Sequence, residues 1–595
     1  MSGSSPHVPF DLQSPAERAY FERFGDGLVV VLAAQPPGPS GWGPGGPPHG
    51  GAWIHVGADG RVRAFTGKVE VGQGTRTALS LLVAEELRVP LSSVDLTMGD
   101  TDLSPWDMGT FGSRSMPDAG AHLRTTAAAA RGFLLELGAN RLGVPSEAVE
   151  LSDGQVRALG EQEVRAVAYS DLLGGLRRRE MVPAPTRPIP PSEWIRAGHP
   201  AMNMGGREIV TGARQYASDL HLPGMMYGKI LFPPAPGAKL RGVDVSRARA
   251  LAGAIVLQEG DWVAVAAATL PIAHAALKAL RADWEIPSLP SEAGIVEYLR
   301  QHPAEGEDFW DVIHHEVGDV PAALAAAPVS LAGMYTAAYI AHVPMETHAV
   351  LAEWQEERLT VWMGTQTPFR ARDALAGALG VPPSSVRVVV PPTGSGFGGK
   401  HAAELAVGAA RLAKAAGHPV RIAFSREEEF TQAYLRPMAV IDVRSGAEKD
   451  GTLTAWQFTT LNAGSAAARI PYRVANQKIE NQPSESPLPQ GSYRALGATA
   501  NNFARESHMD ELAVRVGADP VEYRLRHLAD ERLADVLRAV AVRAGWVSRK
   551  ESGTRRSGPG TGIAVGLEKG GRVATFAEVR VSEDRRLEVV RVVTG

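Results

Sequence analysis

The segment VRVVVPPTGSGFGGKHAAELAVGAARLAKAAG, residues 386–417, decides the fold class. Its pattern predicts a strand over residues 386–390, a glycine-rich turn with G-x-G-x-x-G spacing over residues 394–399, and a helix over residues 402–416. Backbone N–H groups in such a turn can approach an anion, and Lys400 adds a positive charge at the start of the helix. The segment therefore indicates an α/β unit that serves a phosphate-bearing cofactor.

The same turn leaves a dinucleotide site open. The strand predicted in PVRIAFSREEE offers Arg426 and Glu427 as partners for a ribose or a phosphate, as a Rossmann fingerprint requires. Against this, Pro391 and Pro392 lengthen a turn that the fingerprint keeps tight. An NAD(P)-dependent dehydrogenase built on residues 386–427 stays an alternative, and so does a purely structural turn.

A weak internal repeat extends the argument along the chain. GQGTRTALSLLVAEELRVPLSSVDLTMGD (residues 72–100) and GTQTPFRARDALAGALGVPPSSVRVVVPP (residues 364–392) share a turn, a helix, the pattern Val-Pro-x-Ser-Ser-Val and a strand. Two ordinary units could share a favoured helix cap by chance, but the common order covers almost the whole length of both segments. The repeat predicts two equivalent halves of a duplicated module.

The overall composition disfavours several kinds of partner and excludes cysteine-held metal sites on this chain. A chain of 595 residues predicts three or four domains at roughly 150 residues each. The 61 basic and 65 acidic residues give a net charge of -4, which disfavours nucleic acid and anionic membranes as partners. The absence of cysteine excludes thiolate-held zinc and iron–sulfur clusters on this chain. Any one-electron relay must therefore sit on a partner.

The N-terminal region has one apolar run, GLVVVLAA, at residues 27–34. It is far shorter than the roughly 20 residues that a membrane helix needs, and mixed charges precede it where a signal peptide needs net positive charge. We expect a cytoplasmic protein, with a periplasmic one as the alternative if the run acts as a signal. Residues 35–51 are almost all Pro and Gly and predict a linker.

Three further regions have a readable pattern. Residues 206–285 alternate short strands with helical stretches, which predicts a compact α+β insert. Residues 502–546 are helix-rich, and residues 560–595 alternate like a hairpin of strands.

Seven motifs together resemble the large, molybdopterin-binding subunit of the molybdenum hydroxylases, the xanthine dehydrogenase and aldehyde oxidase family. They are GKVEVGQG, GDTDLSPWDMGTFGSRSMPDAG, VTGARQYASDLHLPGMMYG, HVPMETHAVLAEW, GTQTPF, GSGFGGK and YRALGATANNFARESHMDELA. The likeness runs from about residue 53 to residue 595 and is strongest to the isoquinoline 1-oxidoreductase and nicotinate dehydrogenase types. It implies an α+β multidomain fold, in which duplicated molybdopterin-binding α/β modules carry an inserted a/b hammerhead domain.

The resemblance also implies a set of site residues. Gln366 matches the glutamine beside the molybdenum oxo group, and Phe397 lies in the loop that approaches the metal, so both carry catalytic roles. The implied contacts to the cofactor are Gln73, Gly74, Ser113, Ser115, Gly396, Phe397, Gly398 and Arg494. The protein supplies no direct metal ligand, because the pterin dithiolene holds the metal. His342, Glu346 and His348 lack the spacing of a zinc site and are implied to be turn and core residues.

The implied cofactor is molybdopterin with molybdenum, in the cytosine dinucleotide form, and the implied partner is a small subunit with 2Fe–2S clusters. The implied reaction hydroxylates an aldehyde or an N-heteroaromatic carbon with oxygen from water. Two departures matter. His401 stands where purine hydroxylases have a substrate-binding glutamate, and the family's general-base glutamate lies in a C-terminal region that these 595 residues do not contain. We therefore expect an incomplete large subunit with low turnover alone; an inactive scaffold stays a third alternative.

The resemblance predicts the domain organisation. Residues 1–51 form an N-terminal arm and linker, residues 52–205 a permuted molybdopterin-binding segment, and residues 206–290 the hammerhead domain. Residues 330–475 and 476–595 form the first and second parts of the molybdopterin-binding domain.

Overall fold

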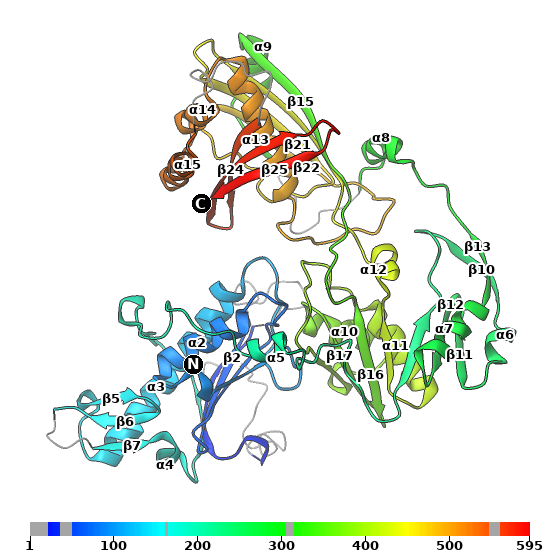
Figure 1. Cartoon of the computed structure of the whole chain (residues 1–595). Coiled ribbons are helices and arrows are strands. Elements are labelled where there is room, and N and C mark those ends of the chain that lie inside the picture. The colour runs from blue at the N-terminus through cyan, green and yellow to red at the C-terminus, as the bar shows by residue number, and fades with distance from the viewer. Residues whose placement is uncertain (1–21, 36–49, 161–164, 305–313, 547–559) are drawn as a thin grey trace, which may run out of the picture. The chain divides into compact units, whose positions relative to one another are not determined.

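The computed structural model describes residues 22–35, 50–160, 165–304, 314–546 and 560–595 (Figure 1). The chain forms two compact units. Unit 1 comprises Met1–Ile286 and Val343–Gln432, and unit 2 comprises Pro287–His342 and Ala433–Gly595. Within the described ranges, no helix combines the length and the apolar character needed to cross a bilayer. Most of the predicted linker, residues 36–49, lies outside the described ranges.

The N-terminal part of unit 1 is a five-stranded sheet in the order β4-β3-β2-β1-β8, with helices packed on it. Its strands are β1 (Gly27–Leu32), β2 (Ala52–Gly57), β3 (Val62–Thr66), β4 (Val94–Met98) and β8 (Arg177–Met181). The helices are α2 (Thr75–Leu87), α3 (Ala121–Leu142) and α4 (Tyr169–Leu173), and β5 (Val149–Ser152), β6 (Gln155–Ala158) and β7 (Ala166–Ala168) form a small separate sheet. The apolar run that begins at Gly27 is β1, an internal strand between β2 and β8. The run belongs to the folded core of the N-terminal sheet.

The second part of unit 1 is a seven-stranded sheet in the order β11-β12-β9-β19-β16-β17-β18. Its strands are β9 (Met226–Ile230), β11 (Ala254–Glu259), β12 (Trp262–Ala267), β16 (Ala349–Gln355), β17 (Arg358–Met363), β18 (Val386–Val389) and β19 (Val420–Ala423). The helices are α5 (Gly206–Val210), α6 (Ser246–Arg249), α7 (Leu270–Ala279), α10 (Pro368–Leu379), α11 (Glu404–Ala416) and α12 (Arg426–Gln432). The predicted insert is not self-contained, because β9, β11 and β12 continue the sheet through a parallel β9–β19 pair. Only β10 (Lys239–Asp244) and β13 (Arg281–Glu285) pair apart from it.

The internal repeat is visible in the structure. Helix α2, the 3-10 turn Leu91–Ser93 and strand β4 in the first copy correspond to α10, the turn Pro383–Ser385 and β18 in the second. Both helices end on a left-handed residue, and both strands pair in parallel with the strand before the repeat. The copies also meet: Thr101 N–H donates to Val388 O at 3.0 Å, and Val390 N–H donates to Gly99 O at 3.1 Å.

The predicted dinucleotide unit does not form. Strands β18 and β19 are separated in the sheet by β16 and β17, and β16 runs antiparallel to both of its neighbours. A dinucleotide fold instead places the strands of its first βαβ unit side by side. Arg426 begins helix α12, and its guanidinium donates to the backbone oxygens of Pro344 and Met345 at 2.8 and 3.0 Å. The assignment of Arg426 and Glu427 as nucleotide partners on a strand is therefore wrong.

Unit 2 is a five-stranded sheet in the order β14-β22-β21-β20-β15, followed by helices and a three-stranded meander. The strands are β14 (His314–Val317), β15 (Val329–Ala337), β20 (Ala439–Ala447), β21 (Leu453–Leu461), β22 (Asn476–Gln482), β23 (Gly560–Glu568), β24 (Gly571–Val581) and β25 (Leu587–Thr594). The helices are α8 (Ile295–Gln301), α9 (Val320–Ala326), α13 (Ala498–Arg515), α14 (Pro520–His527) and α15 (Glu531–Ala544). The helix-rich tract and the C-terminal strands predicted from the sequence are both confirmed.

The core of unit 2 holds a neutral histidine whose titration makes stability depend on pH. His508 is fully buried; its Nε2 lies 2.8 Å from Ser445 Oγ and its Nδ1 lies 3.1 Å from the Tyr335 hydroxyl. Burial lowers the pKa of His508 to about 4. The unfolded chain takes up a proton near pH 6.5 and the folded chain only near pH 4, so stability is full above pH 6.5 and is lost as the pH falls between these values.

We expect this residue to remove about 3 kcal/mol of the unfolding free energy of unit 2 between about pH 7.5 and pH 4. Hydrogen exchange of peptides from α13, measured across that range, checks the slope. The His508→Gln variant is the control, because it has no titratable ring; a variant that keeps the full slope contradicts the assignment.

Candidate functional site

Gln366 lies at the junction of three segments of unit 1 and is almost fully buried. Its side-chain Oε1 accepts the Gly398 N–H at 2.9 Å, and its Nε2 donates to Thr110 O at 2.8 Å. Its backbone N–H donates to Lys400 O at 2.8 Å, and its backbone oxygen accepts from Thr110 N–H at 2.8 Å. These bonds bring GTQTPF, the glycine-rich loop and the GTFGSRS segment together.

The bonds also fix which way the Gln366 amide points. An N–H faces the side-chain oxygen and a carbonyl faces the side-chain nitrogen, so a flipped amide would lose both bonds. The nitrogen uses one of its two hydrogens on Thr110, and among the described residues no acceptor is paired with the second. The protein itself therefore sets the orientation of the Gln366 amide.

Thr110 bonds the segment before the GQG turn, and a buried ion pair lies next to it. The Thr110 hydroxyl accepts the Val69 N–H at 2.8 Å. Beside it, Lys68 Nζ lies 2.8 Å from Asp107 Oδ1 and donates to Gly109 O at 2.7 Å, and Asp107 accepts the Gly109 N–H. Gly109 has φ 132, a backbone conformation that favours glycine. The chain of contacts runs from strand β3 to Gln366.

The GQG turn is held by a carboxylate from the same chain. Glu70 accepts the N–H groups of Gly72, Gly74 and Arg76 at 2.9, 3.0 and 2.8 Å, at the positive end of helix α2. The Gln73 side chain accepts from Val71 N–H at 2.7 Å and donates to Val69 O at 3.1 Å. The Gly74 amide is thus already engaged, and it does not fit the role of a phosphate donor in this arrangement.

Ser113 and Ser115 lie at the start of the helix that continues into α3. Gly120 lies against Leu79 and Leu82 of α2, whereas Arg124 and Arg131, further along α3, bond Glu86 near the end of α2. The two helices therefore run in the same direction and begin at the same end of the pair. The Glu70 carboxylate already occupies the positive end of α2, and the start of the second helix is a further positive end that favours a negatively charged group. Ser113, with φ 59, is exposed there and fits such a contact.

The glycine-rich loop is ordered by its own backbone. Ser395, Phe397 and Gly398 have φ 81, 56 and 94, all in the left-handed region. The N–H groups of Gly394, Ser395, Gly398 and Gly399 already bond acceptors of the protein. The expectation that this loop cradles a phosphate with its amides is therefore not supported. Gly396 and Gly398 of the loop lie against the Gln366 side chain, and Phe397 between them in sequence is half-buried.

Lys400 does not face solvent. Its side chain is fully buried, and Nζ lies 3.2 Å from Glu346 Oε2. Burial lowers the pKa of Lys400, and the Glu346 carboxylate offsets part of that effect. Its charge is thus matched inside unit 1, so it is not the anion ligand that its place after the glycines suggests.

Arg494 belongs to unit 2 and is exposed, just before helix α13. The two residues after it, Ala495 and Leu496, have φ 69 and 51. Each costs roughly 1–2 kcal/mol for a residue with a Cβ. The backbone that follows Arg494 is therefore strained at two consecutive positions.

Sequence reasoning missed four residues that hold the site: Lys68, Glu70, Asp107 and Thr110. Of these four, only Glu70 could have been predicted from the sequence, because an acidic residue two positions before a G-x-G turn at a helix start can cap that helix. Among the described residues, no group of three His, Asp or Glu side chains is arranged to hold a metal ion.

Comparisons with known proteins bear on these contacts. Two family models described as molybdopterin cofactor-binding domain match residues 12–182 and 302–528. A nicotinate dehydrogenase subunit of Pseudomonas putida is 29% identical over 532 residues, 83% of this chain and 44% of the relative. The beta subunit of isoquinoline 1-oxidoreductase of Brevundimonas diminuta is 28% identical over 612 residues, 91% of this chain and 78% of the relative. The chain thus spans less than half of the nicotinate dehydrogenase subunit.

Solved structures agree in fold. Quinoline 2-oxidoreductase of Pseudomonas putida 86 aligns with a TM-score of 0.53 at 21% identity, covering 64% of this chain and 61% of that one. Aldehyde oxidoreductase of Desulfovibrio gigas aligns with a TM-score of 0.53 at 20% identity, covering 65% and 51%. The fold and the matched domains define a molybdopterin-binding class of protein. Within that class, the two matched domains and the named relatives support the assignment of the chain to the molybdopterin-binding part of the molybdenum hydroxylase family.

Proposed function

We propose that the chain is the molybdopterin-binding part of an oxidoreductase that hydroxylates an aldehyde or an N-heteroaromatic carbon with oxygen from water. The observation that carries the proposal is Gln366, whose amide is locked by Gly398 and Thr110 and retains one oriented N–H. A donor fixed in this way stabilises a negatively charged oxygen of a bound group without reorganising during the reaction. The names of the relatives, nicotinate dehydrogenase and isoquinoline 1-oxidoreductase, support this substrate class.

The site residues have distinct roles in this proposal. Gln366 donates to the cofactor, and Gly396, Phe397 and Gly398 form the loop that approaches it. Gln73, Ser113 and Ser115 lie at the two helix starts of unit 1, and Arg494 is assigned to the cofactor by the family resemblance alone. The Gly74 amide contributes only if Glu70 releases it, because the carboxylate holds that N–H. When bound, the cofactor supplies the metal centre that accepts two electrons from the substrate.

The form of the cofactor, the partner subunit and the domain boundaries are assigned from the resemblance to the family. The cofactor is the cytosine dinucleotide form, and a small subunit with 2Fe–2S clusters receives the electrons, since this chain has no cysteine to hold a cluster. Residues 206–290 form the a/b hammerhead domain. Residues 52–205, 330–475 and 476–595 form the molybdopterin-binding parts, and the protein is cytoplasmic.

The test is the molybdenum content of the protein purified from its own host, measured by elemental analysis with intact mass. We expect close to one molybdenum atom per chain.

Arg494→Met is expected to lower this ratio about tenfold, because a charged hydrogen bond contributes roughly 1.5–3 kcal/mol. Arg515→Met is the matched control, since Arg515 is also exposed in unit 2 and bonds Ser330 O, away from Arg494 in sequence. A wild-type protein without molybdenum, purified from its own host, would contradict the proposed function.

A further inference from the structure

The HVPMETH segment contains two side chains, Glu346 and His348, that contact the glycine-rich loop. Glu346 and His348 both lie between the first strands of unit 1 and the loop in sequence, and neither belongs to the set of site residues implied by the family. Their contacts with the loop occur at its two ends, Gly394 and residues 399–400.

Glu346 contacts the first end of the loop through backbone and side chain together. Its backbone N–H donates to Gly394 O at 3.0 Å, and its Oε2 accepts the Gly394 N–H at 2.8 Å. A Cβ added at Gly394 would lie 2.6 Å from Glu346 Cβ, so the close approach requires glycine there. The loop entrance is thus packed directly on residue 346.

The same carboxylate contacts the other end of the loop. Lys400 Nζ lies 3.2 Å from Glu346 Oε2, and both side chains are within 5% of complete burial. The second oxygen, Oε1, accepts the Ser218 N–H at 3.3 Å. Because a buried charge is costly unless it is paired, each partner confines the other to this position.

His348 adds a second bracket at the exit of the loop. Its Nε2 lies 3.2 Å from Gly399 O, and its Nδ1 lies 3.0 Å from a carboxylate oxygen of Glu429. Burial would raise the pKa of Glu429, but the hydrogen bond and charge of His348 outweigh it, and the pKa is lowered. The Glu429 carboxylate therefore holds the His348 imidazole in place beside the loop.

We infer that Glu346 is a positioning residue: through Gly394 and Lys400 it clamps both ends of the glycine-rich loop, and so holds Gly398 against Gln366. The role given to this clamp rests on the proposed function, because the loop and Gln366 are the residues that would face the cofactor. It concerns the chain's own backbone, however, and does not need the cofactor to be present. The clamp explains why Lys400, which the sequence places at the start of a helix, is buried beside Glu346.

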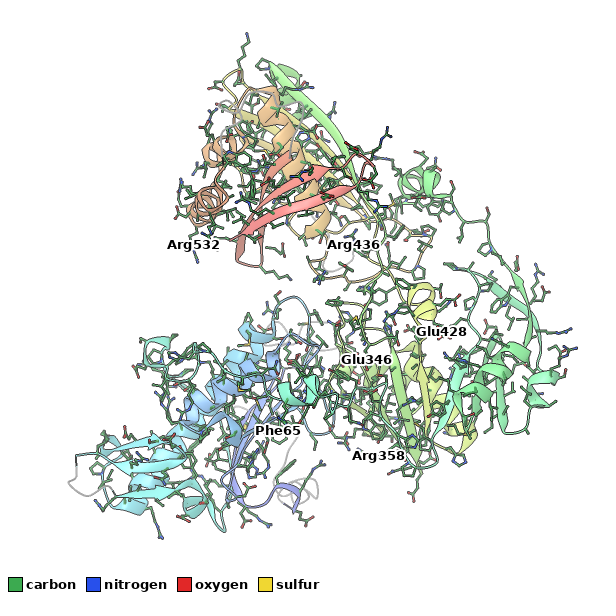
Figure 2. The ribbon with its side chains drawn as sticks, in the orientation of Figure 1. Phe65, Glu346, Arg358, Glu428, Arg436 and Arg532 are labelled. Atoms are coloured by element: carbon green, nitrogen blue, oxygen red, sulfur yellow. The ribbon has the colours of Figure 1, made fainter. Side chains whose placement is uncertain are left out.

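The experiment compares three variants with the wild-type chain. Glu346→Ala removes both acceptors, whereas Glu346→Gln keeps an oxygen for the Gly394 N–H and removes only the charge. Glu428→Gln is the matched control, because Glu428 forms a largely buried pair with Lys229 at 2.8 Å that does not touch the loop. Glu346 and Glu428 are both labelled in Figure 2.

Hydrogen exchange of a peptide covering residues 391–403 is the first readout, measured without added cofactor. We expect exchange at the loop to rise about tenfold or more in Glu346→Ala, to rise less in Glu346→Gln, and to stay unchanged in Glu428→Gln. Partial rescue by glutamine separates a specific acceptor from a general loss of stability. If Glu346→Ala fails to fold, Glu346→Gln against Glu428→Gln still decides the question.

Two outcomes overturn the clamp: loop exchange that matches wild type in both Glu346 variants, or an equal rise in Glu428→Gln. Molybdenum per chain is the second readout, and it is expected to fall in the order wild type, Glu346→Gln, Glu346→Ala. A wild-type protein that carries no molybdenum defeats the proposed function alone, since the exchange experiment still supports or rejects the clamp.

Discussion

Replacing Arg524 by methionine is expected to lower the unfolding free energy of unit 2 by about 3–5 kcal/mol. Arg524 is fully buried, and its Nε and one terminal nitrogen bond Glu506 Oε2 and Asp510 Oδ1 at 2.8 and 2.6 Å. Its other terminal nitrogen donates to the Glu506 backbone oxygen at 2.9 Å. Methionine fills most of the volume but leaves the Glu506 carboxylate, also buried, with one cation fewer.

Glu506 is the centre of this network. It also accepts from Arg505 Nε at 2.9 Å, from the Tyr472 hydroxyl at 2.9 Å and from Val565 N–H at 3.2 Å. Burial alone would raise the pKa of Glu506, but the two arginines outweigh it, and the pKa is lowered. Loss of Arg524 removes the larger of these two effects, so the burial of the Glu506 carboxylate is no longer fully compensated.

Urea unfolding followed by circular dichroism measures the effect. Arg538→Met is the matched control, because Arg538 forms an exposed pair with Asp535 at 2.7 Å, and such pairs contribute at most about 1 kcal/mol. Adding Glu506→Gln to Arg524→Met should recover part of the loss, because it removes the unpaired charge. A loss no larger than that of Arg538→Met would show that the network does not stabilise unit 2.

Replacing Gly396 by alanine is expected to dislodge Gln366 and to lower the molybdenum content about tenfold or more. A Cβ at this position would lie 2.6 Å from Gln366 Oε1 and 3.1 Å from its Cδ. The side chain can yield only by giving up its bonds to Gly398 and Thr110, which contribute roughly 1 kcal/mol each. We expect the unfolding free energy of unit 1 to fall by about 1–3 kcal/mol as well.

Gly377→Ala is the control for this substitution. Gly377 lies within helix α10, and an added Cβ there would meet no atom within 4 Å. That alanine should stabilise the helix by about 0.5–1 kcal/mol, the opposite sign. Elemental analysis and urea unfolding of the two variants check the pair of expectations. A Gly396→Ala protein with wild-type molybdenum content would mean that the loop is not held against Gln366.

Much of the fold could be predicted because its signals are local. The repeat at Gly72 and Gly364 carries its own turn, helix and strand, and both copies fold as expected. The merging of β9, β11 and β12 with β16–β19 could not be predicted, since it depends on strand edges far apart in sequence. Alternation of apolar residues identifies a strand but not its neighbour in the sheet.

The site shows the same division. The motif around Gln366 identifies that residue but not the side chains that orient it, because Lys68, Asp107 and Glu346 act through buried pairs. Sequence patterns place charged residues at the surface by default, and these three are within about 5% of complete burial. The glycine-rich loop is a related case: its amides look available in the sequence, but side chains from distant segments, Glu346 and Gln366, already accept the Gly394 and Gly398 N–H groups.

The contact between the two repeats has a consequence for synthesis of the chain. The Thr101 hydroxyl accepts the Val388 N–H at 2.9 Å from a residue 287 positions later. At typical translation rates, the ribosome needs on the order of 15 to 60 s to supply that partner. During this interval the nascent N-terminal sheet has an incomplete edge next to β4, so a chaperone that covers this edge would protect it. Unit 1 is thus completed late, although its first sheet is among the earliest parts to leave the ribosome.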